Sequence, residues 1–346
     1  MLKGHTEMSV LNAAIIGCGT IFEKHAEAVA GLEKARLYAV CDIDAEKAEK
    51  AAKQYGCRCF TDFCEMLEDD AINVVHICTP HYLHAPMAIK AMERGKHVLT
   101  EKPMAISVRD AGEMIRVSRK TDKTLGVCFQ NRYNATSMKI REVLRSGKAG
   151  KILGAKAIVT WSRSGEYYTE SGWRGTWEKE GGGVLINQSI HTLDLVQWFM
   201  GEIDGIKAHV DTRLLKGIIE VEDTADATIT FKSGSSCIFF ATNNYAVNSP
   251  VEIEIICENA VLKLRDILDI SYSDGSEEHI SEAEKAAGQK AYWGDSHKYL
   301  IGDFYEGLLK GKKFALDGEE GIVAIKMIDA IYRSSKTNDY VQLQTI

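Results

Sequence analysis

The sequence predicts an α/β protein in which a doubly wound parallel sheet is followed by an α+β region. In the first third, short apolar runs rich in β-branched residues alternate with helical patterns, as in a parallel sheet covered on both faces. After about Asn131, strand-type runs follow one another without helices between them. At 346 residues, the chain is long enough for about two domains. We expect one domain over residues 1–131, with a flexible arm at 1–9, and a second over 132–346, whose C-terminal helix packs back on the first.

Each strand and helix of the first domain has its own signal. Apolar runs predict five strands, at residues 13–16, 37–41, 74–78, 97–99 and 125–129. One helix carries Pro86 early in its pattern and is followed by Gly95. The next helix follows Ser107, a residue type that caps helix N-termini. This alternation predicts a doubly wound order of strands.

The second domain is predicted to contain an antiparallel or mixed sheet with few helices. Strand-type runs lie at residues 152–161, 225–231, 237–242 and 251–257. Helical patterns lie at residues 137–145, 185–199, 297–310 and 319–333. A run of neighbouring strands followed by amphipathic helices is typical of an α+β domain.

Charge, hydropathy and cysteine content exclude several classes of protein. The 42 lysines and arginines against 49 aspartates and glutamates give a net charge of −7, which disfavours a nucleic-acid partner. No apolar run approaches the roughly 20 residues that span a bilayer, and residues 1–9 lack the apolar core of a signal peptide. Cys57, Cys59 and Cys64 have no fourth ligand nearby. We therefore expect a cytoplasmic protein with nine reduced cysteines, no membrane partner and no metal site.

A glycine loop follows the first predicted strand and opens a helix, as a dinucleotide site requires. Gly17 permits the tight turn, and Gly19 allows the backbone to approach a pyrophosphate. Thr20 and Glu23 have the spacing of a capping box at the helix N-terminus that would face the phosphates. Phe22 replaces the third glycine of the fingerprint. The loop predicts a nucleotide site of the Rossmann type.

An acidic residue at the end of the second predicted strand indicates which cofactor is bound. Asp42 follows the glycines by roughly 20 residues, where a carboxylate accepts hydrogen bonds from both hydroxyls of the adenosine ribose. No basic residue follows it at once to receive a 2′-phosphate, although Lys47 and Lys50 lie further along. The sequence therefore predicts NAD, with NADP less favoured.

Three further segments carry polar residues suited to a catalytic site. Thr79, Pro80 and His84 follow the strand at 74–78, and the run Glu101-Lys102-Pro103 follows the strand at 97–99. Both segments lie at the carboxyl edge where doubly wound sheets bind ligands. In the second domain, a run of three glycines leads into a predicted helix that places Asn187, His191 and Asp194 on one face. A lysine at the mouth of a cofactor site is well placed for proton transfer.

Together these motifs resemble the Gfo/Idh/MocA family, the relatives of glucose-fructose oxidoreductase and inositol dehydrogenase, over nearly the whole chain. The family's fold is a Rossmann domain followed by an α+β domain with a large, open, mostly antiparallel sheet. The resemblance also implies a cis peptide before Pro103 and a homodimer or homotetramer. The NAD contacts that it and the motifs imply are Gly17, Gly19, Thr20, Ile21, Asp42, Thr79, Pro80, His84, Glu101 and Lys102.

The resemblance assigns proton transfer to Lys102 and His191. Oxidation of an alcohol delivers a hydride to the nicotinamide and a proton to a base whose pKa lies near the working pH. The residues alone leave open which of the two is the primary base. Many inositol dehydrogenase-like members carry Asp at the position of Asn187. Because an amide cannot accept a catalytic proton, Asn187 would hydrogen-bond and orient a sugar hydroxyl instead.

A segment rich in aromatic residues and arginines, residues 161–177, predicts the substrate-binding surface. Aromatic faces pack against the C–H faces of pyranose rings, and arginines bind hydroxyls, carboxylates or phosphates in a fork. Beside Asn187 and His191, the expected substrate contacts are Asn131, Arg132, Tyr168, Trp173 and Arg174.

The resulting hypothesis is an NAD-dependent dehydrogenase or reductase that acts on a ring hydroxyl of a sugar or glycoside. The segment from Asn187 to His191 is similar to the branch of the family that oxidises glucose-type rings, which favours C3 of a glucopyranosyl compound. Two alternatives from other classes are a glycoside-cleaving enzyme that retains NAD and oxidises its substrate transiently, and a sensor that binds sugar and NAD without catalysis.

Overall fold

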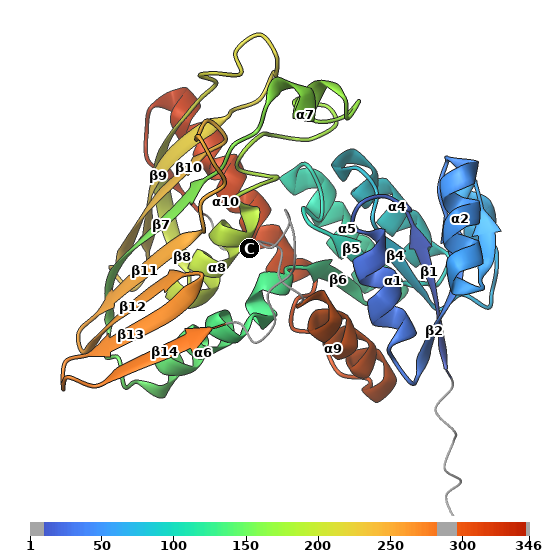
Figure 1. Cartoon of the computed structure of the whole chain (residues 1–346), viewed down its shortest axis with the longest axis horizontal. Coiled ribbons are helices and arrows are strands. Elements are labelled where there is room, and N and C mark those ends of the chain that lie inside the picture. Colours follow the sequence, from blue (N-terminus) through green and yellow to red (C-terminus); the bar gives the residue numbers. More distant parts are fainter. Residues whose placement is uncertain (1–9, 282–295, 344–346) are drawn as a thin grey trace, which may run out of the picture. The chain divides into compact units, whose positions relative to one another are not determined.

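The computed structural model describes residues 10–281 and 296–343, so the expectation of a flexible arm at 1–9 lies outside the described residues. The chain divides into two compact units, each assembled from several segments (Figure 1). The first unit comprises Met1–Ala105, Arg109–Cys128 and Ser296–Gly321. The second comprises Ile106–Val108, Phe129–Asp295 and Ile322–Ile346.

The first unit contains a parallel sheet with the strand order β3-β2-β1-β4-β5-β6. Its strands are β1 (Leu11–Ile16), β2 (Ala35–Cys41), β3 (Arg58–Phe60), β4 (Val74–Ile77), β5 (His97–Glu101) and β6 (Leu125–Cys128). Its helices are α1 (Phe22–Ala30), α2 (Ala45–Tyr55), α3 (Phe63–Leu67), α4 (His81–Glu93), α5 (Val108–Thr121) and α9 (His297–Lys310). The structure confirms the predicted doubly wound sheet, in which β4 and β6 are buried at every position.

The start of α1 differs from the prediction. The helix begins at Phe22 and has no side-chain cap, so the capping box expected from Thr20 and Glu23 is wrong. Thr20 lies in the turn before the helix, and Glu23 instead accepts a 2.7 Å hydrogen bond from the hydroxyl of Tyr55. The Phe22 side chain is buried and meets the Tyr55 ring edge-on at 5.7 Å. The bulky residue at the third glycine position is therefore accommodated against the end of α2.

Two other helix boundaries show how well local signals locate the ends of helices. α4 begins at His81, so Pro86 lies inside the helix rather than near its first residue. Gly95 follows the helix with a φ of 76°, a conformation that favours glycine. α5 begins directly after Ser107, as predicted.

The second unit contains a mixed, mostly antiparallel sheet with the order β14-β13-β12-β11-β7-β10-β9-β8-β15. Among the described strands of this sheet, only β7 and β10 pair in parallel. The strands are β7 (Ile152–Thr160), β8 (Ile203–Asp211), β9 (Thr224–Phe231), β10 (Ser236–Thr242), β11 (Glu252–Cys257), β12 (Ala260–Arg265), β13 (Ile267–Tyr272), β14 (Glu277–Ser281) and β15 (Val341–Gln342). The helical elements are η1 (Gln130–Tyr133), α6 (Ala135–Ser146), α7 (Gly165–Thr169), α8 (Ile190–Met200) and α10 (Gly318–Thr337), whose first residues belong to the first unit.

α8 begins five residues later than predicted, which changes the expected site. Asn187 lies before the helix in a turn, where its N–H donates to the carbonyl oxygen of Gly183 at 3.1 Å. The prediction that Asn187, His191 and Asp194 share one helical face is therefore wrong, because only the last two lie on α8. The glycines before the turn adopt backbone conformations that a helix does not contain, with φ of 83° at Gly181 and 153° at Gly182.

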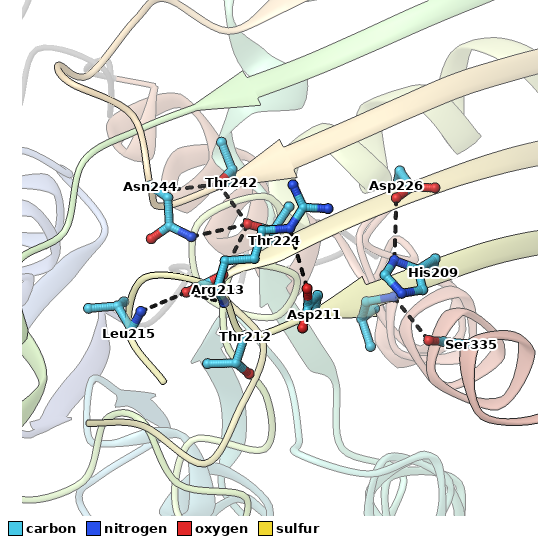
Figure 2. A network of polar contacts seen from close by, with 12 residues as sticks. His209, Asp211, Thr212, Arg213, Leu215, Thr224, Asp226, Thr242, Asn244 and Ser335 are labelled. Atoms are coloured by element: carbon cyan, nitrogen blue, oxygen red, sulfur yellow. Dashed lines mark hydrogen bonds and ion pairs between the residues drawn. The ribbon is translucent and has the colours of Figure 1, made fainter. Parts of the chain in front are cut away.

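A polar network at the ends of β8, β9 and β10 holds the loop at residues 212–221 (Figure 2). Buried Asp223 accepts hydrogen bonds from the backbone N–H groups of Arg213 and Leu215, each at 3.0 Å. Thr224 and Thr242 join the neighbouring strands through their hydroxyls at 2.9 Å. The loop held in this way packs Leu215, Ile219 and Val221 against Tyr168 of α7, with Tyr167 beside them. The network thus fixes the helix that carries both tyrosines.

Candidate functional site

In the first unit, the carboxyl ends of four adjacent strands carry the residues predicted to bind the nucleotide. The strand order reverses beside β1, between β2 on one side and β4 on the other, which is the switch point where such sheets bind ligands. Gly17 follows β1, Asp42 follows β2, Thr79 follows β4 and Lys102 follows β5.

The two glycines of the loop are required for different reasons. Gly17 has a φ of 97°, and a Cβ placed on it would lie 2.6 Å from the carbonyl oxygen of Cys78. It is therefore needed by the turn itself. A Cβ on Gly19 would meet no described atom within 4 Å, and Gly19 is exposed. The open space beside Gly19 fits a nucleotide phosphate that approaches the backbone.

Asp42 is held in place by the loop that it accompanies. Its Oδ2 accepts from the N–H of Cys18 at 2.7 Å, and its Oδ1 accepts from the N–H of Asp44 at 2.9 Å. Exposed Lys47 forms an ion pair with Asp44 at 3.0 Å. The half-buried Asp42 carboxylate therefore has a fixed orientation at the end of β2, as a ribose contact requires.

His84 connects the ends of β4 and β5. Its two ring nitrogens each lie 2.7 Å from a backbone carbonyl oxygen, those of Pro103 and Thr79. Burial lowers the pKa of His84, and the two carbonyl oxygens oppose that effect. A neutral ring donates to one of these oxygens, whereas an imidazolium donates to both. In either form His84 joins two of the segments predicted to bind the cofactor.

A buried chain of hydrogen bonds holds Glu101 at the end of β5. His25 Nε2 lies 3.0 Å from Glu101 Oε1, His25 Nδ1 lies 2.9 Å from His76 Nδ1, and His76 Nε2 lies 2.9 Å from the Tyr305 hydroxyl. Burial by itself raises the pKa of Glu101, but hydrogen bonds and charges from His25 and His297 hold it well below its ordinary range. Burial lowers the pKa of both His25 and His76.

These pKa directions determine where the protons lie in the chain. An ionised Glu101 only accepts hydrogen bonds, so neutral His25 donates to it from Nε2. His25 Nδ1 then accepts from His76 Nδ1, and His76 Nε2 accepts from Tyr305. The other oxygen of Glu101, Oε2, accepts from the backbone N–H of Lys102 at 3.2 Å. The chain therefore orients the turn that carries Lys102.

The structure confirms a cis peptide between Lys102 and Pro103. The Lys102 side chain is half-buried, and Pro103 is buried. Lys102 thus projects from a turn that is held by Glu101 on one side and by the bond from His84 to the Pro103 carbonyl on the other.

Three side chains of the first unit have a spacing that a metal ion could use. His25, Glu101 and His297 are buried and place one donor atom each within 4.8 Å of one another. Both ring nitrogens of His25 already take part in the hydrogen bonds described above. His25 therefore has no ring nitrogen left for a metal ion, whereas both ring nitrogens of His297 are buried without a well-formed hydrogen bond among the described residues. These residues are far apart in sequence, so their spacing does not indicate a ligand group, unlike that of Cys57, Cys59 and Cys64.

In the second unit, His191 is the second residue of α8 and is half-buried. Its Nε2 lies 3.5 Å from the side-chain nitrogen of Gln130, and the ring of Phe129 meets the imidazole edge-on at 5.8 Å. Among the described residues, the side-chain oxygens of Gln130 and Asn131 are buried without a hydrogen-bond partner. These acceptors lie on η1, the element that also contacts His191.

Asn187 contacts a buried carboxylate and a tyrosine hydroxyl. Its Nδ2 donates to Glu180 Oε1 at 2.5 Å and lies 3.5 Å from the hydroxyl of Tyr167. The side-chain nitrogen of Gln188 lies 3.3 Å from the same hydroxyl. Tyr167 therefore joins the two amides that precede α8.

A second amide pair lies behind this one. The side-chain nitrogen of Asn243 donates to Gln188 Oε1 at 3.0 Å and to the hydroxyl of Tyr168 at 2.7 Å. Tyr168 is 3% exposed, and burial raises the pKa of its hydroxyl. Tyr168, expected to contact substrate, thus supports Gln188 from inside the unit.

Two buried glutamates lie on either side of the glycine turn. Glu180 Oε2 accepts from the N–H of Gly175 at 2.5 Å. Glu222 accepts from the N–H groups of Gly183 and Leu185 at 3.0 and 2.9 Å. Burial raises the pKa of each carboxyl to about 7, although the hydrogen bonds oppose it. A Cβ on Gly183 would lie 1.8 Å from the Glu222 carbonyl oxygen, so the turn needs glycine there.

Arg174 stacks between two aromatic rings. Its guanidinium lies 4.4 Å from the ring centre of Tyr167 and 4.7 Å from that of Trp173. A second guanidinium, that of Arg163, lies 5.3 Å from the Tyr167 ring centre. Such cation–π contacts hold the flat guanidinium in one orientation. Trp173 and Arg174, both predicted substrate contacts, are half-buried.

Arg132 is bound to a partner that the sequence did not indicate. Its Nε and Nη2 donate to the two carboxylate oxygens of Asp194 at 2.8 and 2.6 Å, and both side chains are nearly fully buried. This two-point ion pair joins η1 to α8 and supports the His191 imidazole indirectly.

Several polar residues of the second unit have no recognisable signal in the sequence. Glu180 precedes the glycine run without a signal of its own, because one glutamate in a loop is normally solvated. Gln188, Asn243 and Gln130 were not proposed for the same reason. Tyr167 lies in the aromatic segment but was not named as a contact.

Each part of the chain matches a known domain family. Residues 11–129 match the family described as an oxidoreductase family with an NAD-binding Rossmann fold. Residues 137–263 match the Gfo/Idh/MocA C-terminal domain. The first match includes the nucleotide loop and Lys102, and the second includes Asn187 and His191.

Individual relatives are similar over almost their whole length. D-glucoside 3-dehydrogenase of Escherichia coli K12 is 28% identical, over 99% of this chain and 100% of the relative. Myo-inositol 2-dehydrogenase of Thermotoga maritima is 22% identical, over 97% and 99%. The solved WlbA dehydrogenase of Bordetella pertussis, in complex with NADH and UDP-GlcNAcA, is 28% identical with a TM-score of 0.84, over 97% of this chain and 99% of that one.

The fold and the nucleotide loop define an NAD-dependent oxidoreductase with a Rossmann domain and a C-terminal α+β domain. The chain belongs to the Gfo/Idh/MocA family, whose curated members include sugar and inositol dehydrogenases. Its cofactor is NAD, and the open space beside Gly19 and the oriented Asp42 carboxylate fit it. None of the described helices is both long and apolar enough to cross a bilayer.

Proposed function

We propose that the protein oxidises a secondary ring hydroxyl of a sugar or glycoside, and that the hydroxyl is at C3 of a glucopyranosyl compound. The observation that supports C3 is the match to D-glucoside 3-dehydrogenase, which extends over 99% of this chain. The polar and aromatic groups around Asn187, Tyr167 and Arg174 suit a ring with several hydroxyls, since they combine donors, acceptors and flat apolar faces.

In this proposal the chain's own residues move the proton and hold the substrate. NAD, when bound, accepts the hydride. Lys102 and His191 take the hydroxyl proton, and which of them is the primary base is left open. Asn187 orients a neighbouring hydroxyl through its amide, and Asp42 binds the adenosine ribose. The remaining NAD contacts are Gly17, Gly19, Thr20, Ile21, Thr79, Pro80, His84 and Glu101.

Absorbance of NADH tests the proposal directly. Purified protein is mixed with NAD and with each member of a panel of free hexoses, inositols, glycosides and nucleotide sugars. Accumulation of NADH with glucosides, together with a 3-keto product, is the expected result. Absence of NADH with every compound contradicts the dehydrogenase proposal, and NADH formed only with inositols contradicts the choice of a glucopyranosyl substrate.

A substitution at Lys102 tests its role. Lys102→Ala should lower kcat by about 10²–10⁴-fold, because it removes a positioned proton acceptor. Binding of NADH, followed by fluorescence, should persist because Asp42 and the glycine loop are unchanged. Full turnover in a variant that still binds NADH contradicts the assignment. Lys24→Ala, a change in α1, serves as a control for loss of a lysine elsewhere in the same unit.

We also propose that the protein is a cytoplasmic homo-oligomer that associates through the open face of its nine-stranded sheet. Register places Ile158, Ile238, Phe240 and Ile256 on one face of β7, β10 and β11, and Ile238 is 56% exposed. The Lys156–Glu254 ion pair, at 3.1 Å, lies on the same face, and the apolar side chains around it favour association with a second copy. Light scattering after size exclusion should show a dimer or tetramer, and Ile238→Lys should shift it toward monomer. A monomeric wild-type protein contradicts the proposal.

A further inference from the structure

Buried Glu180 contacts the one amide to which the proposed function gives a substrate-positioning role. We propose that Glu180 is a positioning residue that sets the direction in which the Asn187 amide presents its oxygen and nitrogen to the substrate. This inference rests on the proposed function, because it concerns the same hydroxyl-binding site. It assigns a role to a side chain that the sequence did not single out.

The contacts of Asn187 give the geometric basis. Asn187 Nδ2 lies 2.5 Å from Glu180 Oε1 and 3.5 Å from the Tyr167 hydroxyl, so the nitrogen side of the amide is directed toward the carboxylate. An ionised carboxylate only accepts hydrogen bonds, so it requires a donor at this position. A protonated carboxyl carries an O–H and can donate to the amide oxygen instead. The protonation state of Glu180 therefore selects between two orientations of the Asn187 side chain.

The second carboxylate oxygen of Glu180 cannot move away freely. Glu180 is fully buried, and its Oε2 accepts from the N–H of Gly175 at 2.5 Å. Gly175 has a φ of 78°, and a Cβ on it would lie 2.8 Å from the Ile219 side chain, so this backbone segment is itself fixed. The bond from Gly175 holds the carboxyl in place. Gain or loss of its proton therefore changes the hydrogen bond that it makes with Asn187.

The charged and titratable groups around Glu180 come from several elements. Arg174 favours the ionised form, whereas buried Glu222 favours the protonated form. Tyr168 of α7 and Tyr332 of α10 also face the Glu180 charge, and both stay protonated because burial raises their pKa. The balance leaves the pKa of Glu180 at about 7, so both forms occur near neutral pH.

The two amide orientations present different atoms to the neighbouring sugar hydroxyl. A hydroxyl can donate or accept, and the amide oxygen, which faces the substrate when Glu180 is ionised and binds the nitrogen, fixes that hydroxyl as a donor. A protonated Glu180 would draw the oxygen toward itself and turn the nitrogen outward. Oxidation of the alcohol should therefore improve as Glu180 loses its proton.

Substitution of each buried glutamate separates positioning from a merely structural role. Glu180→Gln keeps the shape but imitates the protonated carboxyl at every pH, because its amide carries a donor. Glu222→Gln is the matched control, since Glu222 flanks the same glycine turn and also has a pKa of about 7. It binds Gly183, Leu185 and Tyr332 instead. For each protein, kcat/KM for a glucoside is measured from about pH 6 to about pH 8.5. The value for wild type is then divided by the value for the variant at each pH.

The ratio for Glu180→Gln should rise from about twofold at the acid end to about tenfold at the alkaline end, as the wild-type carboxyl ionises. The ratio for Glu222→Gln should stay at or below about one and approach one at the alkaline end, because loss of the Glu222 charge only makes Glu180 ionise at lower pH. Taking the ratio cancels the titration of Lys102, His191 and the cofactor, which both proteins share. A ratio for Glu180→Gln that does not change with pH overturns the inference.

A second variant keeps the inference testable if Glu180→Gln fails to fold. Asn187→Ala leaves the Glu180 side chain intact, and its wild-type to variant ratio should show the same rise with pH. A flat ratio for this variant also overturns the inference. Wild-type protein that oxidises no glycoside refutes the proposed function, and this inference with it. Turnover with flat ratios refutes the inference alone.

Discussion

At the scale of single residues, the two glycines of the nucleotide loop look alike in sequence but have different roles in the structure. Gly17 is enclosed by the backbone of Cys78 and has a φ that favours glycine. Gly19 meets no described atom where its Cβ would lie. One glycine therefore serves the fold, and the other leaves room for a ligand.

This difference predicts opposite effects of substitution. Gly19→Val should fold with an unchanged melting temperature but lose the stabilisation by NAD, because its side chain fills the space beside the backbone. In wild type, NAD at about 100 times its Kd should stabilise the fold by about 2.7 kcal/mol. Gly17→Ala should instead lower the melting temperature without ligand. The measurement is thermal unfolding with and without NAD, and a normal NAD shift in Gly19→Val contradicts the assignment.

At the scale of elements, the glycine inside α5 and the glycine in the turn before α8 differ in how closely other residues pack against them. Gly112 lies inside α5, and a Cβ on it would meet nothing within 4 Å. Gly183 lies in the turn before α8, where a Cβ would overlap the Glu222 carbonyl oxygen. Gly112 therefore weakens its helix although a larger side chain would fit there. Gly183 has no room for a side chain.

Gly112→Ala should therefore raise the free energy of unfolding by about 0.5–1 kcal/mol, because alanine loses less conformational entropy in a helix. Gly183→Ala should lower it by more than about 3 kcal/mol, since the backbone of the turn must move. Urea unfolding followed by circular dichroism measures both. A stable Gly183→Ala protein would show that the turn can rearrange.

At the scale of the whole molecule, buried carboxyls make stability depend on pH. Glu222 has its pKa raised to about 7 from an ordinary value of 4.5, so the folded state binds its proton more tightly than the unfolded state. Its contribution to stability is fully present below about pH 4.5 and is lost as pH rises through about 7. Lowered pKa values at His25, His76 and His84 act in the opposite sense, because stability then falls as pH drops below about 6.5.

Glu222→Gln measures the contribution of Glu222 together with its coupling to Glu180, because the histidines titrate equally in both proteins. Relative to the variant, wild type should lose stability on the order of 3 kcal/mol between about pH 5 and about pH 8. The check is the difference in unfolding free energy, measured by urea denaturation at several pH values. A difference that is constant with pH, or that changes in the opposite direction, would mean that Glu222 is ionised as easily in the folded protein as in the unfolded one.

The strands of the parallel sheet were largely predictable from the sequence, whereas its edge strand β3 and several strands of the second sheet were not. Apolar runs bounded by turn residues located β1, β2, β4, β5 and β6 to within two residues. β3 has three residues, of which Arg58 and Cys59 are exposed, so it has no apolar run. β14, the edge strand of the second sheet, alternates exposed and half-buried residues, and such a strand has a weaker signal than a run buried on both faces.

The sequence by itself determined the nucleotide loop, the acidic residue after β2 and the turn that carries Lys102. These features follow from local conformation, since glycines, a strand end and a helix start lie within a few residues of one another. Only the tertiary structure decided the partners of the buried polar groups. His76 bonds to Tyr305, 229 residues away, and Arg132 bonds to Asp194, 62 residues away. Burial forces each such group to find a hydrogen-bond partner, and the folded chain alone decides which residue is within reach.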